Sequence, residues 1–356
     1  MTIGDKGTKK EADMQTLKSS LRKLTSSSSA HFSSAAAASS PRHLLSIADL
    51  SPAEFSFLVD KAAQYRQLIR SESFATTAER QPLTGHTVAM LFSKRSTRTR
   101  VSSEAAINYL GGHPMFLGKE DIQLGVNETL YDTGRVISSM TSCLVARVGP
   151  HSDIAGLAAA SSVPVINALC DTYHPLQAIA DVLTIKEAFK EIKGLRMAWV
   201  GDANNVLNDL ALACAKSGIN VSVATPKEYT VNAKVFSLIK AAAVESGAEV
   251  LICHEPREAI KDADIVVTDT WVSMGQETEK KLRMEQFAGF QVTNELCSVA
   301  KEQWKFMHCL PRKPEEVADE VFYSERSLVF DEAENRLYAM LAALEGFVVR
   351  KGVLSE

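Results

Sequence analysis

From residue 43 onward, the apolar residues of the chain follow two alternating patterns. Some form short runs bounded by polar residues, which is typical of buried strands. Others recur every three or four positions, which is typical of amphipathic helices. Such alternation predicts parallel sheets covered by helices on both faces. The expected strands are Val88–Phe92, Pro114–Leu117, Leu144–Val148, Val163–Asn167, Met197–Val200, Val221–Ala224, Val250–Cys253, Ile265–Thr268 and Phe306–Cys309.

Helix signals fall between most of these runs. The first is a helix start in which Ser51 is the N-cap, Pro52 takes the first helical position and Glu54 completes a capping box. The stretch Pro175–Lys190 lies between two groups of expected strands, so we expect it to bridge two sheets. The last helical stretch, Glu332–Val349, is apolar on one face and is expected to pack back on the first sheet.

The expected fold class is therefore α/β, with two doubly wound parallel-sheet domains joined by a bridging helix. We expect the first domain at residues 41–185, completed by the C-terminal helix at 332–356, and the second at 186–331. Ligands of open α/β sheets bind beyond the carboxyl ends of the strands. Residues that follow the expected strands are therefore the first candidates for chemistry.

Residues 1–40 differ in composition from the rest of the chain. The run Ser26–Ser40 is almost entirely Ser and Ala, too polar to offset its ordering entropy, so we expect disorder. No acid occurs between Met14 and Ala48, and the leucines at 17, 21 and 24 have helical spacing. This profile is typical of a transit peptide and predicts the mitochondrial matrix, with chloroplast or cytoplasm as alternatives. A tail without any address is the other interpretation. The bases in this stretch are Lys18, Arg22, Lys23 and Arg42.

Charge and cysteine content exclude several classes of function. A net charge of −4 in 356 residues gives no reason to expect nucleic acid or an anionic membrane as partner. No apolar run approaches the roughly 20 residues of a spanning helix. The six cysteines have irregular spacing, which indicates reduced thiols. The neighbouring His308 and Cys309 do not make a closed metal site, so no metal is expected.

Hydroxyl and guanidinium groups are concentrated directly after the first expected strand. The run from Ser93 to Arg100 reads SKRSTRTR and leads into a helical stretch. Positive side chains at a helix N-terminus oppose the helix dipole, whereas an anion there is stabilised by the free amides. Arg98 adds a fork suited to phosphate oxygens. We therefore expect a phosphate site at this position.

The sequence from Ser96 to Arg100 resembles the carbamoyl phosphate motif of the aspartate and ornithine carbamoyltransferases, and HPLQ at 174–177 resembles a second motif of that family. The resemblance implies that Thr99, Arg147 and His174 donate to the carbonyl oxygen and that Gln177 accepts from the carbamoyl NH2. Donors fixed around a developing oxyanion supply much of such catalysis. The residues implied to bind carbamoyl phosphate are Ser96, Thr97, Arg98, Thr99, Gln123, Arg147, His174, Gln177, Cys309, Leu310 and Arg336.

Two further segments resemble family motifs for the second substrate. The sequence DTWVSMG at 269–275 resembles the ornithine-specific loop, which implies Asp269 and Ser273 at the α-amino group. Asn205 and the backbone of Met274 are then implied at the α-carboxylate. The sequence HCLPR at 308–312 resembles the motif whose thiol and Leu310 carbonyl border the δ-amine. That amine has a pKa near ~10 and must be neutral to attack. Cys309 and Asp269 are expected to orient or deprotonate it, and the sequence leaves open which takes the proton. The implied catalytic residues are Arg147, His174, Asp269, Cys309 and Arg336.

The resemblance extends from about His43 to the last helix and also implies an assembly. The loop at 119–125 carries Gln123, and in the family this loop reaches the phosphate site of a neighbouring subunit. A homotrimer with shared sites follows from the resemblance. The implied substrates are carbamoyl phosphate and L-ornithine, and no cofactor is expected.

Three other functions are suggested by parts of the sequence or by the fold. The turn after Val200 suggests a dinucleotide fold, but Ala203 and Val206 stand where that fingerprint needs glycines. A relative that uses aspartate or N-acetylornithine is disfavoured by the loop at 269–275, because the aspartate-using relatives lack it and the resemblance implies that it binds the free amino acid. A non-enzymatic paralogue on the same fold is disfavoured because every position needed for chemistry is filled.

Overall fold

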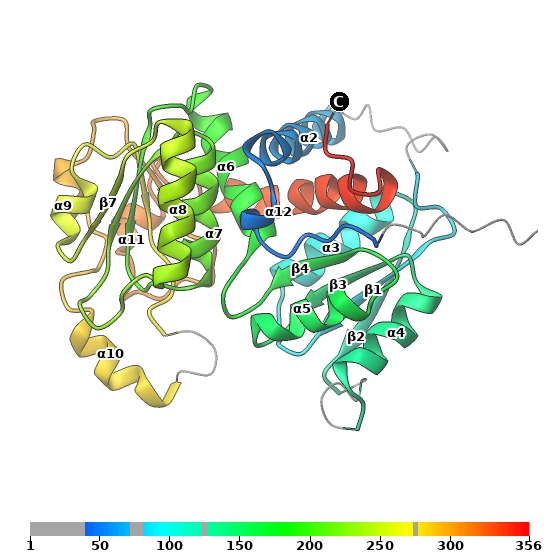
Figure 1. Ribbon diagram of the computed structural model, residues 1–356. Coiled ribbons are helices and arrows are strands. Elements are labelled where there is room, and N and C mark those ends of the chain that lie inside the picture. Colours follow the sequence, from blue (N-terminus) through cyan, green and yellow to red (C-terminus); the bar gives the residue numbers. More distant parts are fainter. Residues whose placement is uncertain (1–39, 72–80, 121, 123–126, 273–276, 356) are drawn as a thin grey trace, which may run out of the picture. The chain divides into compact units, whose positions relative to one another are not determined.

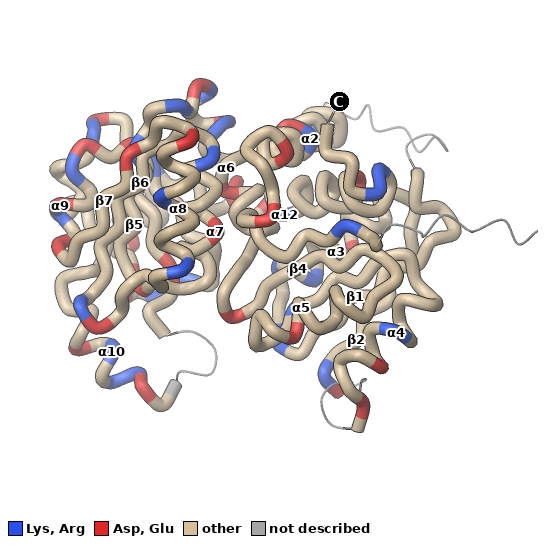
Figure 2. The backbone as a smooth tube through the Cα atoms, in the orientation of Figure 1, with Lys and Arg blue, Asp and Glu red and all other residues tan. Residues whose placement is uncertain are grey.

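The computed structural model describes residues 40–71, 81–120, 122, 127–272 and 277–355. Residues 41–356 form one compact unit, and this unit contains two parallel sheets (Figure 1). Among the described residues, no helix is long and apolar enough to cross a membrane. Basic and acidic positions are interspersed along α8, α9 and α10 (Figure 2), in keeping with the nearly balanced charge of the chain.

The first sheet has four strands in the order β2-β1-β3-β4. The central strands β1 and β3 are almost wholly buried, whereas β2 lies at the edge and is partly exposed. This burial explains why β1 and β3 read as continuous apolar runs. The elements up to this point are η1 (Ile47–Asp49), α2 (Pro52–Arg70), β1 (Thr87–Phe92), α3 (Arg98–Tyr109), β2 (His113–Gly118), α4 (Leu130–Met140), β3 (Cys143–Arg147), α5 (His151–Ala160) and β4 (Val165–Leu169).

The second sheet has five parallel strands in the order β7-β6-β5-β8-β9. Its apolar face away from α7 and α8 packs on a second core that includes Phe287, Trp304 and Phe306. The elements are β5 (Arg196–Val200), α7 (Asn205–Lys216), β6 (Asn220–Ala224), α8 (Ala233–Ser246), β7 (Val250–Cys253), α9 (Pro256–Ile260), β8 (Ile265–Val267), η3 (Glu277–Glu279), α10 (Lys280–Gln286), η4 (Leu296–Val299), β9 (Lys305–Met307) and α11 (Asp319–Phe322).

Two helices join the sheets. Helix α6 (Pro175–Phe189) runs from β4 to β5 and is buried continuously from Pro175 to Ile185. Helix α12 (Val329–Leu344), continued by the π-helical turn η5 (Glu345–Val349), packs against α2, α3 and α6 (Figure 1). One hydrophobic core extends from β1 and β3 through α6 to β5 and β6. The α/β fold class, the bridging helix and the returning C-terminal helix are therefore confirmed.

Local hydrogen bonds set several element ends. Ser51 and Glu54 form the expected capping box at the start of α2. Helix α12 begins before Glu332, because the Glu332 N–H already donates to the Leu328 carbonyl at 2.8 Å. Strand β9 ends at Met307, two residues earlier than expected, because the His308 N–H donates to the Glu332 carboxyl at 2.8 Å instead of to a neighbouring strand.

Candidate active site

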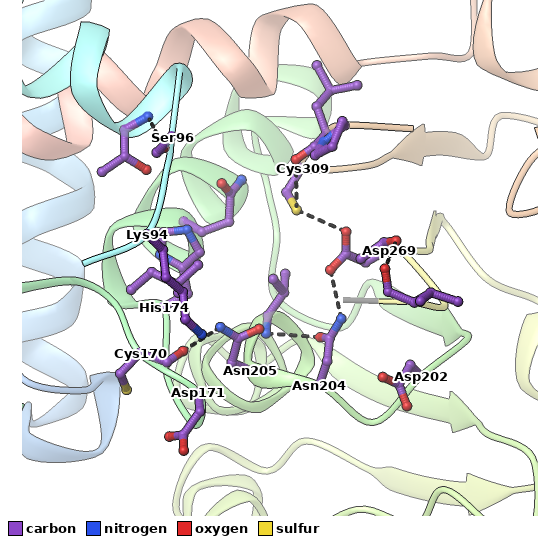
Figure 3. A pocket seen from close by; sticks show the side chains of 18 of the residues that line it. Lys94, Ser96, Cys170, Asp171, His174, Asp202, Asn204, Asn205, Asp269 and Cys309 are labelled. Carbon is purple, nitrogen blue, oxygen red and sulfur yellow. Dashed lines mark hydrogen bonds between the residues drawn. The ribbon is translucent and has the colours of Figure 1, made fainter. Parts of the chain in front are cut away.

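The carboxyl ends of strands from both sheets meet at one pocket of about 1050 Å³. Figure 3 shows side chains that reach it from the segments after β1, β4, β5, β8 and β9. Of the sequence-predicted residues, it brings together Ser96, Thr97, Arg98, Thr99, Arg147, His174, Gln177, Asn205, Asp269, Cys309, Leu310 and Arg336. Gln123, Ser273 and Met274 lie outside the described residues.

The segment after β1 forms the start of α3. The Ser96 hydroxyl accepts from the Thr99 N–H at 3.2 Å, which orders the turn. Arg98 Nη2 donates to the Leu310 carbonyl at 2.7 Å and so links this turn to the segment after β9. Arg100 is turned away, since it pairs with Glu104 and stacks 3.6 Å above the Phe116 ring centre. The phosphate-binding prediction therefore rests on residues 94–99, not on the whole basic run.

Two buried guanidiniums dominate the electrostatics of the pocket. Arg147 at the end of β3 and Arg336 on α12 are 7% and 3% exposed, and neither forms an ion pair with a described carboxylate. Burial, with a contribution from Arg98, lowers the pKa of each to about 10. Their Nε atoms have no hydrogen-bond partner among the described residues. Buried, uncompensated positive charge of this kind is typical of an anion site.

Thr99 and His174 complete the donor side. The Thr99 hydroxyl lies 3.3 Å from Arg336 Nη2 and 3.5 Å from Arg147 Nη1. His174 is the N-cap of α6, and its N–H donates to Asp209 at 2.8 Å. Burial, followed by the charges of Arg336, Arg147 and Arg98, lowers the pKa of His174 well below its usual value. The ring is therefore neutral at physiological pH and able to donate one hydrogen bond.

A thiol and a carboxylate face this donor cluster across the pocket. Cys309 Sγ donates to Asp269 Oδ1 at 3.2 Å, and the Asn204 amide donates to Asp269 Oδ2 at 2.7 Å (Figure 3). Burial, followed by the Asp269 charge, raises the pKa of the Cys309 thiol well above its usual value. Cys309 is therefore a neutral thiol that donates to a fixed carboxylate.

Asn204 and Asn205, at the start of α7, have different roles. Asn204 caps the helix, since its Oδ1 accepts from the N–H groups of Val206 and Leu207. Asn205 donates to the Cys170 carbonyl at 2.6 Å, which ties α7 to the segment after β4 (Figure 3). One N–H of Asn205 is thereby occupied, and one remains for a ligand.

The segment after β9 is held by groups that sequence reasoning missed. The Leu310 N–H donates to His308 Nδ1 at 2.9 Å, so Nδ1 is an acceptor and the ring N–H lies on Nε2, 3.2 Å from Glu316 Oε2. His308 and Glu316 are both fully buried, and Leu310 has a φ of 62°. This arrangement directs the Leu310 carbonyl toward Arg98. Among the described residues, no group of three or more His, Cys, Asp or Glu is placed to hold a metal.

Two carboxyls behind the pocket, Asp181 and Glu332, were also missed. The Gln177 amide donates to Asp181 at 2.7 Å and to Glu332 at 3.1 Å, while its oxygen accepts from Arg336 at 2.6 Å. Both carboxyls lie one helical turn from a predicted site residue, Asp181 after Gln177 and Glu332 before Arg336. Side chains one helical turn apart are neighbours, so this spacing could have identified both carboxyls as candidates for contact with the site.

Comparison with known proteins identifies the family of the chain. Residues 42–187 match the family model "Aspartate/ornithine carbamoyltransferase, carbamoyl-P binding domain", and residues 193–346 match "Aspartate/ornithine carbamoyltransferase, Asp/Orn binding domain". The chain is 62% identical over 336 residues to a mitochondrial ornithine carbamoyltransferase of Coccidioides immitis, covering 90% of this chain and 96% of that protein. It is 58% identical over 314 residues to the mitochondrial ornithine carbamoyltransferase of Schizosaccharomyces pombe, covering 88% and 96%.

Solved structures give the same result. The crystal structure of the mitochondrial ornithine carbamoyltransferase from Coccidioides immitis aligns with a TM-score of 0.83 at 60% identity, covering 89% of this chain and 100% of that one. Ornithine carbamoyltransferase from Pyrococcus furiosus aligns with a TM-score of 0.83 at 42% identity, covering 87% and 98%.

Proposed function

This chain belongs to the aspartate/ornithine carbamoyltransferase family, and we propose that it is an ornithine carbamoyltransferase. It transfers the carbamoyl group of carbamoyl phosphate to the δ-amine of L-ornithine and releases L-citrulline and phosphate. The observation that carries this function is the pocket itself. Buried, unpaired arginines stand on one side, and the bonded Asp269–Cys309 pair stands on the other.

The donor side suits carbamoyl phosphate. Residues 96–99 at the start of α3, with the Arg98 guanidinium, are proposed to bind the phosphate. Thr99, Arg147, His174 and Arg336 are proposed to donate to the carbonyl oxygen, where negative charge develops as the amine attacks. Because these donors are buried and already in place, they stabilise the tetrahedral intermediate without reorganisation. Gln177 Oε1 retains a lone pair for the carbamoyl NH2.

The opposite side suits the amine. The δ-ammonium must lose a proton before its nitrogen attacks the carbonyl carbon. Cys309 is a neutral thiol, so we assign the role of orienting the ammonium and accepting its proton to Asp269, with Cys309 as a donor that fixes the carboxylate. When the C–O bond to phosphate breaks, phosphate leaves with the electron pair and takes up the second nitrogen proton. The Leu310 carbonyl borders the same space.

The remaining ornithine contacts are proposed by resemblance. The free N–H of Asn205 and the backbone of Met274 are assigned to the α-carboxylate, and Ser273 to the α-amino group, together with Asp269. Gln123 is assigned to the phosphate of a neighbouring subunit. We further propose that residues 41–185, with 332–356, form the carbamoyl phosphate domain and that 186–331 form the ornithine domain.

A homotrimer is proposed for the assembly. Several large apolar side chains on α3, β2 and α4 are exposed in the single chain, which is typical of a surface covered by another subunit. They are Val101, Met115, Tyr131, Val136 and Met140. A mitochondrial location is supported by the relatives from Coccidioides immitis and Schizosaccharomyces pombe and by the acid-free stretch before Ala48, and we propose the matrix as the compartment.

Site variants test the proposed function. Arg98→Ala and Arg147→Ala should each lower citrulline formation from carbamoyl phosphate and ornithine by at least about 100-fold, because each removes a fixed donor. Light scattering should show the same assembly as the unmodified protein. Near-normal turnover in either variant would contradict the assignment of that arginine to carbamoyl phosphate binding.

A further inference from the structure

Two carboxyl groups lie buried where α6 and α12 pack together. Asp181 on α6 and Glu332 on α12 are each 1% exposed. Both hydrogens of the Gln177 amide are directed at them, one at Asp181 and one at Glu332. Glu332 also accepts from the His308 N–H, directly before Cys309. The pair therefore contacts Gln177, on the carbamoyl phosphate side of the pocket, and His308, next to Cys309 on the amine side.

The two carboxyls also lie close together, because Gln177 Nε2 is 2.7 Å from an Asp181 oxygen and 3.1 Å from a Glu332 oxygen. Two buried carboxyl groups held on one amide nitrogen disfavour a second negative charge, so one of them retains a proton. Burial raises the pKa of Asp181 to about 7 and, with the charge of Asp181, raises the pKa of Glu332 well above its usual value. The pair thus holds one proton and one negative charge. The other titratable groups that face it are Arg336, Asp269, Cys309 and Cys214.

We infer that Asp181 and Glu332 act as one proton-sharing unit that positions Gln177 and Arg336 for the carbamoyl group. Because the pair takes both amide hydrogens, the Gln177 oxygen must face the other way. There it accepts from Arg336 Nη1 at 2.6 Å. Arg336 is thereby held with Nη2 on Thr99. Neither carboxyl lines the pocket, so both act through other residues, and the inference rests on the function proposed above.

Substitutions at position 181 test this inference. In Asp181→Asn, the new side chain is neutral and its oxygen still accepts from Gln177, so both the single negative charge and the Gln177 bonds of the unit are retained. We expect kcat for citrulline formation within about threefold of the unmodified protein. Asp181→Leu keeps the branched shape of the side chain but is larger and has no acceptor, so Gln177 is free to rotate. We expect kcat to fall by about 100-fold, with a smaller change in KM for ornithine.

A matched control separates positioning from folding. Thr184→Val alters a buried polar group one turn further along α6, whose partners are Ala180 and Asn335 and not Gln177. It should lower Tm without changing kcat. If Asp181→Leu is unstable, the double variant Asp181→Leu/Glu332→Met replaces the pair by apolar side chains, a change that cores tolerate. It should fold and still show the loss of kcat.

Two readouts report on coupling and on the proton. In a Gln177→Ala background, Asp181→Leu should cause less than about threefold further loss of kcat, because it acts through Gln177. At pH 8, the infrared difference between the unmodified protein and Asp181→Asn should contain the carbonyl stretch of a protonated carboxyl. If the unmodified protein is active, three results would each overturn the inference. They are a normal kcat in Asp181→Leu, a multiplicative loss of kcat when Gln177→Ala and Asp181→Leu are combined, and the absence of the protonated carboxyl band. An inactive unmodified protein would instead overturn the proposed function.

Discussion

Removing the Arg147 charge should stabilise the protein while it removes function. A guanidinium normally titrates above about 12, whereas burial and the charge of Arg336 lower the pKa of Arg147 to about 10. A pKa that is lower by one corresponds to about 1.4 kcal/mol. The folded, ligand-free protein therefore disfavours the charged form of Arg147 by about 3 kcal/mol. Arg147→Met replaces it with an unbranched apolar side chain in the same buried space. The change sacrifices only a weak contact with Thr99 at 3.5 Å.

Some of this gain is lost to imperfect packing. We expect Arg147→Met to be more stable than the unmodified protein by about 1–3 kcal/mol, which raises Tm by about 2–6 °C. Phosphate should reduce or reverse this difference in stability between the two proteins. At 100 times Kd it stabilises the unmodified protein by about 2.7 kcal/mol through mass action. It should add almost nothing to the variant.

Thermal unfolding at fixed protein concentration, in phosphate or in chloride of the same ionic strength, measures both effects. Arg70→Met is the matched control, because Arg70 is exposed and pairs with Glu334 on the surface. It should change Tm little and leave the phosphate response intact. If Arg147→Met is less stable than the unmodified protein and responds equally to phosphate, Arg147 is a structural cation and does not form an anion site.

Three further outcomes follow from the described contacts. Ser51→Ala removes the capping box of α2 and should lower stability by about 1 kcal/mol with unchanged kcat, as denaturant unfolding and a citrulline assay will show; an equal loss of activity contradicts it. The His174 ring, whose folded pKa lies below its unfolded value, should not titrate by NMR between about pH 6 and 8, and its contribution to stability should be lost as pH falls below about 6.5. Alkylation of Cys309, followed by mass spectrometry, should still accelerate about tenfold per pH unit near pH 9, because its thiol pKa is raised; a plateau below pH 9 argues for a thiolate.

The strands were predictable because strands buried on both faces have continuous apolar sequences. Runs such as Val88–Phe92 and Met197–Val200 are buried on both faces in parallel sheets, and a continuous apolar run is the result. The order of strands was not predictable, since it depends on contacts between distant segments. The sequence does not say that β3 lies between β1 and β4, or β5 between β6 and β8.

The candidate site divides in the same way. Residues that follow strands, such as Arg147 and Asp269, could be nominated from position and chemistry, and the structure brings them into one pocket. The residues that hold them could not. Glu332 meets Gln177 across 155 positions of sequence, and His308 finds Glu316 inside a turn whose backbone the sequence does not define. Asn205 also shows a contact, with the Cys170 carbonyl, that no local pattern indicates.

Acceptor specificity distinguishes an ornithine carbamoyltransferase from its relatives. Purified full-length protein should be incubated with carbamoyl phosphate and, in parallel reactions, with L-ornithine, L-aspartate or N-acetylornithine, and the carbamoylated products measured by mass spectrometry. We predict L-citrulline and an equal amount of phosphate from ornithine, and no product from the other two acceptors. Carbamoyl-aspartate or N-acetylcitrulline as the main product, or no product from a folded protein that binds phosphate, would contradict the proposed ornithine carbamoyltransferase activity.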